Sequence, residues 1–511
     1  MKIKDLLIPV AFGLITTWTV QYLFFPRVQQ TVSEGKPGAE FLAPVATQTA
    51  QPLTLEVDFN DASSTRAEAL TKIDTPGATY VFSNNGAVLQ NVIIKKKSAH
   101  QENEFAIITP PATRENGAFL VALNDLGQTP YYYDLISQQK EGDTVLLTYK
   151  AESEKAQVIK SFRVYDNAYR IDLDITLLPK GQTSLQARVL FPAPFLDDPT
   201  SADVVSAVIY SDRNTFVKKS IIDTAGRGWE HPLYIGVEDR YFAHMLVQDT
   251  QKFTQRAYFK PEQTNRLIAI LEGPVVSEKT QWSLSFYCGP KESEAFELVD
   301  SRLDGLLDYG WFAPISKPLL YVLKFLYSFL HNYGFAIIAL TLLLKLIMAP
   351  FAAQAEKSSK LGAEMKRKLS YIEQKYRHDP ATLERERGVI LRKQGLSMLG
   401  CLPVLLQIPI FIGLNRVLSS SIELYKAPFI GWITDLSARD PYYVLPLLVG
   451  LGMFAQQFQT KNAPQMLSMG LLALVLTGVS TNLAAGLCLF IAVSTWASIG
   501  QTYIQKALKA W

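Results

Sequence analysis

Long stretches without charged residues dominate the last 200 residues of this 511-residue chain. A helix of about 18 to 20 apolar residues is long enough to cross the hydrocarbon core of a bilayer. The C-terminal part contains five such runs, at about Tyr333–Phe351, Met398–Leu418, Tyr442–Gln459, Pro464–Thr481 and Ala485–Tyr503. The sequence therefore predicts that much of this part lies in a membrane.

A sixth apolar run, Leu6–Phe25, follows Lys2 and Lys4 near the start of the chain. A cleaved signal peptide is one interpretation of this run. The run is long for the apolar core of a signal peptide, and the small-residue segment Ala43–Ala46 lies too far downstream for cleavage. An uncleaved membrane anchor fits better.

The net charge of +3 is the difference between two unlike parts. Residues Arg27–Gly310 carry a net charge of −9, and the remainder carries +12. The segment between Phe351 and Ser397 holds 11 Lys and Arg against 6 Asp and Glu, which predicts a cytoplasmic position. Counting spans outward from it places both termini in the cytoplasm and residues 27–310 outside.

The external segment has the pattern of a β domain. The runs Thr79–Val81 and Val88–Ile94 flank Asn84-Asn85-Gly86, a strong hairpin turn signal. Asp166-Asn167 separates Val158–Tyr165 from Tyr169–Leu177 in the same way. Four further strands are predicted, at Thr144–Tyr149, Tyr241–Gln248, Asn265–Leu271 and Trp282–Tyr287. Many short strands at this spacing favour a sandwich of antiparallel sheets.

An amphipathic helix is predicted at Ala313–Asn332. Lys317, Lys324 and His331 recur every seven residues and share one face of an otherwise apolar helix. This pattern is typical of a helix lying in the membrane interface. A seventh, tilted span is the alternative.

The cytoplasmic segment is expected to form a helical hairpin. Apolar residues at three-to-four spacing lie on one side of its first arm: Leu361, Met365, Leu369, Ile372 and Tyr376. Asp379-Pro380 supplies an N-cap and a first helical residue for the second arm. Basic residues are candidates for partner docking: Lys366, Arg367, Lys368, Arg385 and Arg387. A merely solvated hairpin explains the same pattern.

No pattern typical of an enzyme or a metal site is found in the sequence. There is no phosphate-binding loop, no dinucleotide fingerprint and no HExxH motif. The five histidines are scattered, and none is spaced from a cysteine as metal ligands are. We therefore expect no catalytic residue, no metal and no cofactor.

Lys345 is the one charged residue in the interior of a predicted span, since Arg416 lies near one end of Met398–Leu418. Snorkelling toward the cytoplasmic surface would explain it, and so would a water-filled cavity among the helices. Three polar residues within the predicted spans favour the cavity: Thr341, Gln407 and Asn415. Weaker polar points are Gln456, Ser494, Thr495 and Ser498. No acidic residue of the predicted spans pairs with Lys345.

Two segments resemble the YidC family of membrane protein insertases. Gly400–Leu414 (GCLPVLLQIPIFIGL) is similar to the third-span signature of that family, and Ser421–Pro446 is similar to the external loop that follows it. The order of an anchor, a β domain and five spans with a charged hairpin resembles the Gram-negative form.

The resemblance implies a polytopic α-helical membrane protein with six spans, a five-helix insertase core and a periplasmic antiparallel β-sandwich domain. The expected parts are an anchor at 1–26, a linker at 27–52, the periplasmic domain at 53–310, the interfacial helix at 311–332 and the core at 333–511, with the hairpin at 352–397.

The family's groove-lining positions fall on Lys345, where arginine is usual, and on Thr341 and Gln407. The implied function is insertion and folding of bacterial inner-membrane proteins through a hydrophilic groove, without catalysis. The implied partners are nascent membrane proteins, the Sec translocon and its accessory subunits, the ribosome or signal-recognition machinery, and lipids, but not DNA. A secondary transporter using Lys345 is the alternative, although no inverted repeat or acidic ion site supports it. An envelope-assembly enzyme would need a nucleophile or metal cluster that the sequence does not show.

Overall fold

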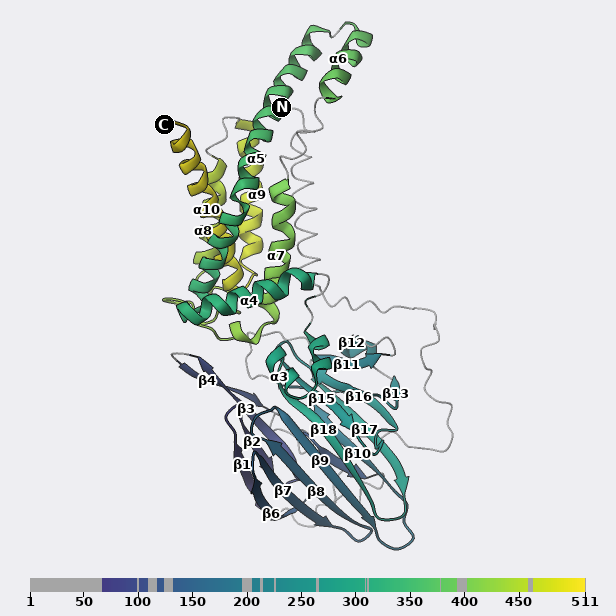
Figure 1. Ribbon diagram of the computed structural model, residues 1–511. Helices are drawn as coiled ribbons and strands as arrows, with labels where there is room; N and C mark the ends of the chain where they lie inside the picture. Colours follow the sequence, from purple (N-terminus) through teal and green to yellow (C-terminus); the bar gives the residue numbers. More distant parts are fainter. Residues whose placement is uncertain are drawn as a thin grey trace. The chain divides into compact units, whose positions relative to one another are not determined.

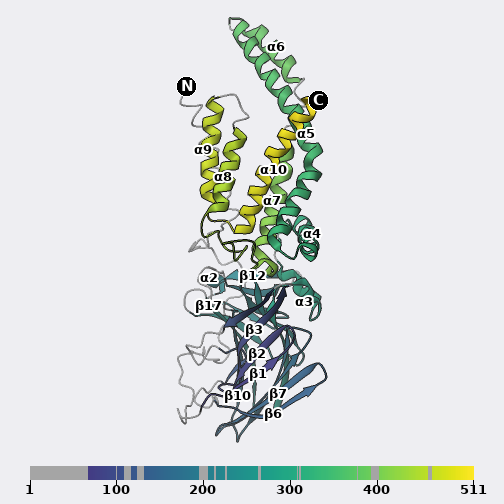
Figure 2. The ribbon, with the colours of Figure 1, turned by 90° about the vertical axis from the view of Figure 1, so that its left-hand side faces the viewer.

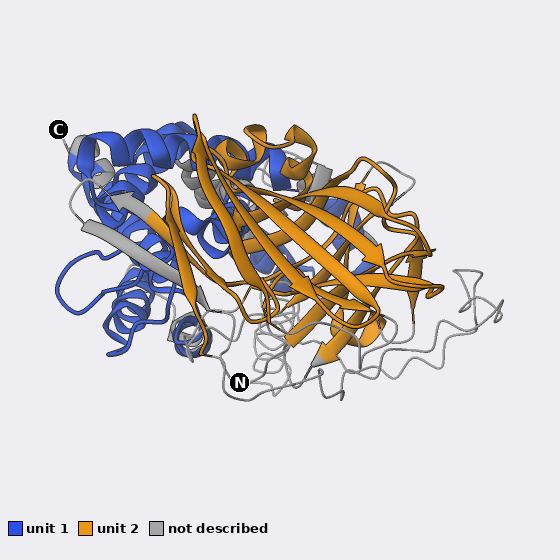
Figure 3. Cartoon of the chain, turned by 90° about the horizontal axis from the view of Figure 1, so that it is seen from below, with its two compact units in different colours: residues 1–32, 309–511 blue, residues 33–308 orange. Residues whose placement is uncertain are grey.

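The chain is described by a computed structural model with two compact units, residues 33–308 and a unit that includes residues 309–511 (Figure 3). The structure describes residues 67–98, 101–108, 117–123, 132–194, 205–211, 215–224, 227–262, 266–307, 309, 312–376, 378–392, 402–457 and 463–510. The predicted anchor at Leu6–Phe25 and the linker lie outside the described residues. We call the two parts the β unit and the helical unit.

The described strands of the β unit form three antiparallel sheets (Figure 1). The four-stranded sheet has the order β1 (Leu70–Asp74), β2 (Ala78–Ser83), β3 (Val88–Ser98), β4 (Gln101–Ile108). The five-stranded sheet has the order β13 (Gly228–Glu230), β16 (Arg256–Glu262), β17 (Arg266–Val276), β10 (Leu185–Pro192), β5 (Leu120–Leu123). The nine-stranded sheet has the order β12 (Thr215–Ser220), β11 (Ser206–Ser211), β14 (Ile235–Glu238), β15 (Phe242–Asp249), β18 (Thr280–Pro290), β9 (Arg170–Pro179), β8 (Ala156–Tyr165), β7 (Thr144–Glu152), β6 (Asp134–Glu141).

The two predicted hairpins are confirmed. The turn at Asn84–Gly86 joins β2 to β3, and the turn at Asp166-Asn167 joins β8 to β9. Buried and half-buried residues alternate along β7 and β8, as expected of strands with one face on a core. The edge strand β6 was missed because its sequence, DLISQQKE, is largely polar and exposed.

An aromatic core joins the three sheets. The rings of Phe82 in β2 and Phe162 in β8 lie 4.9 Å apart, and those of Phe191 in β10 and Phe286 in β18 lie 5.3 Å apart. Phe119, which precedes β5, is fully buried and lies 4.7 Å from the ring of Phe286. Aromatic pairs at these separations contribute packing energy beyond their buried area.

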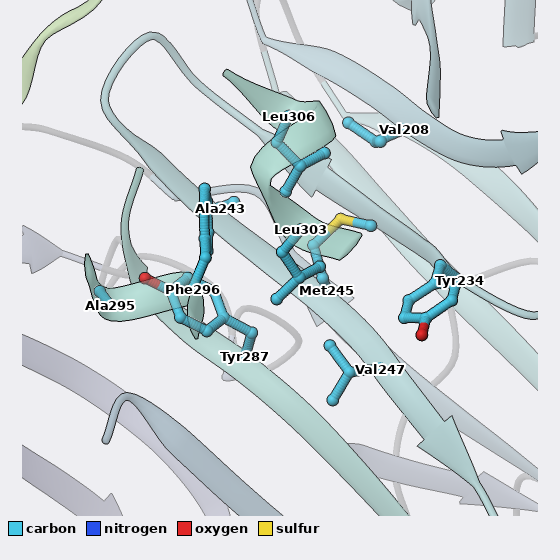
Figure 4. Close-up of a cluster of buried hydrophobic side chains, with 10 residues drawn as sticks. All are labelled: Val208, Tyr234, Ala243, Met245, Val247, Tyr287, Ala295, Phe296, Leu303 and Leu306. Atoms are coloured by element: carbon cyan, nitrogen blue, oxygen red, sulfur yellow. The ribbon is translucent and has the colours of Figure 1, made fainter. Parts of the chain in front are cut away.

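Short helices cover part of the nine-stranded sheet. They are α2 (Ile221–Thr224), α3 (Ser293–Glu297) and the 3₁₀ helix η2 (Ser301–Leu306). Figure 4 shows Phe296 of α3 and Leu303 of η2 packed onto Met245 of β15 and Tyr287 of β18. The last two helices of the β unit, α3 and η2, are therefore packed against the nine-stranded sheet.

The helical unit consists, within the described residues, of seven α-helices and one short 3₁₀ helix. They are α4 (Ala313–Leu330), α5 (Tyr333–Lys375), α6 (Pro380–Arg392), α7 (Leu402–Ser420), η5 (Ile422–Leu424), α8 (Val444–Gln457), α9 (Ala463–Ser480) and α10 (Ala485–Ala510). α10 packs against α5, α7 and α8, whereas α9 packs against α8. In Figure 2, α8 and α9 form a pair beside a group made by α5, α7 and α10.

Two described helices are long and apolar enough to cross a membrane, Tyr333–Phe351 within α5 and Ala485–Ile504 within α10. Val444–Gln456 in α8 is a shorter apolar helix. α7 and α9 lie where two more spans are predicted, Met398–Leu418 and Pro464–Thr481. The prediction of six spans is therefore met by these helices only in part.

Candidate functional site

Lys345 lies on α5, in the apolar part of that helix. Its side chain is partly buried, and its ammonium donates a hydrogen bond of 2.9 Å to Oγ of Ser498 on α10. Within the described residues, no carboxylate forms an ion pair with it. An ammonium has three N–H donors, so two remain available for another acceptor.

Ser498 belongs to a row of hydroxyl residues on α10. Ser494, Ser498 and Thr502 are spaced four residues apart, and each of the last two donates to the carbonyl one turn before it. This bond satisfies the Ser498 hydroxyl as a donor and leaves its oxygen to accept from Lys345. The four-residue spacing is a sequence signal that marks Ser498 as part of a row of hydroxyls, but it does not identify Lys345 as the partner.

A second polar contact links α8 to α10. Gln456 donates from Nε2 to the carbonyl oxygen of Thr495 at 3.2 Å. Ser494 and Thr495 are largely buried. Lys345 of α5 and Gln456 of α8 therefore both bind α10, which carries hydroxyl side chains of its own.

The other predicted groove residues have different surroundings. Thr341 is 1% exposed, and its hydroxyl donates to the carbonyl of Ile337 in its own helix. Gln407 and Asn415 lie on α7 and are partly exposed, and neither side chain is hydrogen-bonded to another described residue. The structure thus brings Lys345 together with Ser498, and a groove shared with Gln407 and Asn415 stays a prediction.

The basic candidates of the hairpin lie on two helices. Arg367 and Lys368 are exposed on the distal part of α5, and Arg385 and Arg387 are exposed on α6. Lys366 is in α5, but its side chain lies outside the described residues. Asp379 accepts from the backbone N–H of Thr382 at 3.2 Å and from its hydroxyl at 2.6 Å, so it caps α6 as expected.

The helix α4 has one face turned to the protein and one turned away from it. Leu319 and Leu323 are buried, whereas Tyr321, Phe325 and Phe329 are each more than 60% exposed. These three aromatic residues are spaced four apart and form a single stripe.

The polar side of α4 is anchored by an ion pair. The Lys324 ammonium lies 2.8 Å from a carboxylate oxygen of Glu423 in η5, and this carboxylate is nearly buried. The predicted polar stripe of α4 thus includes a contact inside the protein rather than one with solvent alone.

No cluster of metal-ligating side chains is found in the described part of the chain. Within it, no three His, Cys, Asp or Glu side chains gather closely enough to hold a metal ion.

Comparison with known proteins assigns both units. The family model described as "60Kd inner membrane protein" matches residues 325–510, and the model described as "YidC periplasmic domain" matches residues 70–322. The membrane protein insertase YidC of Geobacter sp. (strain M21) is 31% identical over 461 residues, which cover 86% of this chain and 85% of that relative. The chain belongs to the YidC family of membrane protein insertases. Its β unit is accordingly the periplasmic domain of the family, and the protein belongs to the bacterial inner membrane.

A second relative agrees with this assignment. The YidC insertase of Geobacter metallireducens is 28% identical, with 95% of this chain and 93% of the relative covered. A crystal structure described as an active YidC insertase with its first transmembrane domain resolved covers 86% of this chain and 93% of its own, at 18% identity and a TM-score of 0.38. The family assignment does not favour the transporter alternative.

Proposed function

We propose that this protein inserts proteins into the bacterial inner membrane by receiving their polar external segments beside Lys345. The observation that carries the proposal is the ammonium on α5, which has one serine hydroxyl as its partner and, in the described part of the chain, no carboxylate. An ammonium in an apolar helix costs free energy, and an ionisable residue at such a position marks a functional site. The function proposed for it here is to attract acidic or polar segments.

The proposed route has two steps, and neither forms or breaks a covalent bond. The polar segment first enters among α5, α7 and α10, where Gln407 and Asn415 offer further polar groups. The apolar segment of the client then leaves along α7 and α9 into lipid. Lysine supplies a point charge rather than the planar fork of arginine, so the attraction depends little on the orientation of the carboxylate.

The topology we propose is six spans with both termini in the cytoplasm. The spans are the anchor Leu6–Phe25 and the helices α5, α7, α8, α9 and α10. In this arrangement α4 lies at the periplasmic surface, and the stripe of Tyr321, Phe325 and Phe329 enters the lipid headgroup layer.

The hairpin formed by the distal part of α5 and by α6 is proposed as the cytoplasmic docking element. Its exposed arginines and lysines suit a negatively charged partner, such as the ribosome or the signal-recognition machinery. Association with the Sec translocon and its accessory subunits is proposed from the family relationship.

The test compares matched clients in proteoliposomes. One single-span client carries an acidic external segment, and the other carries the same segment with Asn and Gln in place of Asp and Glu. We expect Lys345→Glu to reduce insertion of the acidic client about tenfold or more, and Lys345→Arg to preserve it. Lys279→Glu, which changes an exposed turn of the β unit by the same charge, is the matched control. Equal insertion of the acidic client by the original protein and Lys345→Glu at low salt would refute the electrostatic step.

A further inference from the structure

A pocket of about 740 Å³ opens in the β unit. It is bordered by the segment that follows β13, by the turn between β15 and β16, by the start of β9 and by η2. This volume lies within the range of sites that hold small ligands or a few residues of peptide, and it is too large for a single small ion.

Two arginines on the pocket wall are held in fixed positions. Arg170 binds Asp172 through Nε at 2.8 Å and Nη2 at 3.2 Å, and its Nη2 also reaches Ser285. Arg302 binds Asp300 through Nε at 3.0 Å and Nη2 at 2.8 Å. A guanidinium has five N–H donors, so both arginines keep donors beyond those that fix them.

The carboxylates of the pocket wall are already engaged. Both oxygens of Asp300 accept from Arg302, and one also accepts from the hydroxyl of Tyr234 at 2.5 Å. Burial opposes ionisation of Asp300, but the hydrogen bonds from Arg302 and Tyr234 outweigh it and lower the pKa of this carboxyl. Asp249 accepts from the backbone N–H groups of Phe253 and Thr254. The carboxylates of the wall are therefore engaged, whereas its two arginines keep unused donors.

Two further residues of the wall extend this donor surface. Lys252 and His231 are exposed, and neither side chain is bonded to another described residue. Both have a positive φ, of 54° and 44°, which is uncommon for residues with a side chain. Nearby, Thr254 is 3% exposed, and its buried hydroxyl has no partner within the described residues.

Another part of the wall is apolar. It is formed by Pro232, Leu233, Val247 and Val299, and the lining also includes the polar residues Gln248 and Thr250. Leu233 is 56% exposed, although a leucine gains free energy when it is covered. A ligand that fills the pocket must therefore combine acceptor oxygens with apolar groups.

We propose that this pocket binds a short acidic peptide segment in which carboxylates alternate with apolar side chains. The carboxylates accept from Arg170, Lys252 and Arg302, and an apolar side chain covers Leu233. Identifying the peptide as an external segment of a client rests on the proposed insertase function, whereas binding itself does not.

The experiment measures binding of a six-residue peptide of alternating Asp and Leu, with an uncharged fluorophore, to the full-length protein in a neutral detergent. The matched peptide carries Asn in place of Asp. We expect the acidic peptide to bind at least tenfold more tightly than the Asn peptide, with a difference that shrinks as salt rises. Equal affinity for the two peptides would overturn the proposal.

Two surface variants test the location without disturbing the fixed arginines. Lys252→Asn removes the charge and suits a positive φ, and Leu233→Ser removes the exposed leucine of the apolar wall. We expect the two changes together to weaken binding about tenfold, and Lys279→Asn, in an exposed turn, to leave it unchanged. Unchanged binding by the double variant would refute this site.

Competitors and a second variant separate the remaining explanations. Inorganic phosphate or phosphatidylglycerol micelles that displace the peptide fully at equal concentration would refute a peptide site in favour of an anion or lipid site. Lys345→Glu is expected to keep full peptide binding. If it does so while insertion is normal in that variant, the groove proposal fails and the pocket proposal stands.

Discussion

The two units each contain a lysine withdrawn from water, and the two are treated in opposite ways. Lys160 in the β unit is fully buried, and its ammonium donates to three backbone carbonyls: those of Gly86 at 2.9 Å, Ala87 at 2.5 Å and Phe119 at 2.6 Å. Lys345 in the helical unit is partly buried and donates to Ser498 alone among the described residues. The first ammonium has no donor left, and the second has two.

Lys160, whose three N–H donors are all bonded, has a structural role. Gly86 and Ala87 lie in the turn of the four-stranded sheet, Phe119 precedes a strand of the five-stranded sheet, and Lys160 is on β8 of the nine-stranded sheet. Burial lowers the pKa of Lys160 well below its ordinary value. The three carbonyls oppose that shift, because a neutral amine could donate only two of the three bonds.

The difference separates structural lysines from those available to a ligand. Burial alone marks both residues as costly, since an ammonium in an apolar environment is unfavourable unless it is hydrogen-bonded. The count of satisfied donors tells them apart. A lysine with spare donors can bind a further acceptor, and a lysine without them cannot.

The largest effect on stability is expected from replacing Lys160. Lys160→Met leaves three buried carbonyls without a donor, and we expect a loss of about 3 kcal/mol or more in the free energy of unfolding of the β unit. Pulse proteolysis of the full-length protein in urea measures it. Lys279→Met, on the surface, should change this free energy by less than about 0.5 kcal/mol. A loss below about 1 kcal/mol in Lys160→Met would contradict the structural role.

A second effect depends on pH and also concerns the β unit. His244 on β15 is bonded through Nδ1 to the carbonyl oxygen of Pro192 on β10 at 2.8 Å, so it links two sheets. Burial lowers the pKa of His244 to about 4, against the smaller opposing effect of that bond.

Because the unfolded chain takes up a proton near pH 6.5 and the folded chain only near pH 4, the stability that His244 gives above pH 6.5 is lost as the pH falls between these values. We expect a loss of about 3 kcal/mol over this range, and a flatter profile in His244→Gln. Urea unfolding of both proteins from pH 7 to 4 tests this; parallel profiles would exclude His244 as the cause.

Lys345 should show a small effect on stability and a large one on function. Because its ammonium has one neutral partner and is partly exposed, we expect Lys345→Met to change the free energy of unfolding of the helical unit by less than about 1 kcal/mol. Thermal unfolding in nanodiscs measures it. A loss as large as that of Lys160→Met would make Lys345 a structural residue and remove the contrast between the two units.

The smallest effect is expected at the partner of Lys345. Ser498→Ala removes the acceptor but keeps the charge, so insertion of an acidic client should fall no more than about threefold. Ser498→Asp supplies a carboxylate to Lys345, and we expect it to lower insertion of the acidic client more than Ser498→Ala does. The reverse order would show that neutralising the ammonium does not matter.

The sequence predicted the parts of the fold whose patterns are local. Turn signals at Asn84–Gly86 and Asp166-Asn167 located two hairpins, and long apolar runs located α5 and α10. Strands such as the polar edge strand β6 and the three-residue β13 were missed because pairing with neighbours, rather than their own pattern, holds them in a sheet.

The site was predictable to a similar extent. Lys345 was found because a charge within an apolar run is conspicuous. Its partner Ser498 lies 153 residues away, and no local pattern specifies that contact. Lys160 was overlooked although the alternation in β8 puts it on the buried face with Val158 and Phe162. The three carbonyls that bind its ammonium come from distant parts of the chain, which no local pattern shows.

The helix α5 connects Lys345 to the hairpin as one continuous element. It has 43 residues, about 65 Å at the usual rise, and contains Pro350 five residues after Lys345. A proline lacks the N–H that would bind the carbonyl of Leu346, so the helix bends most easily there. A partner that displaced the hairpin would therefore bend α5 near Pro350, about one and a half turns from the ammonium of Lys345.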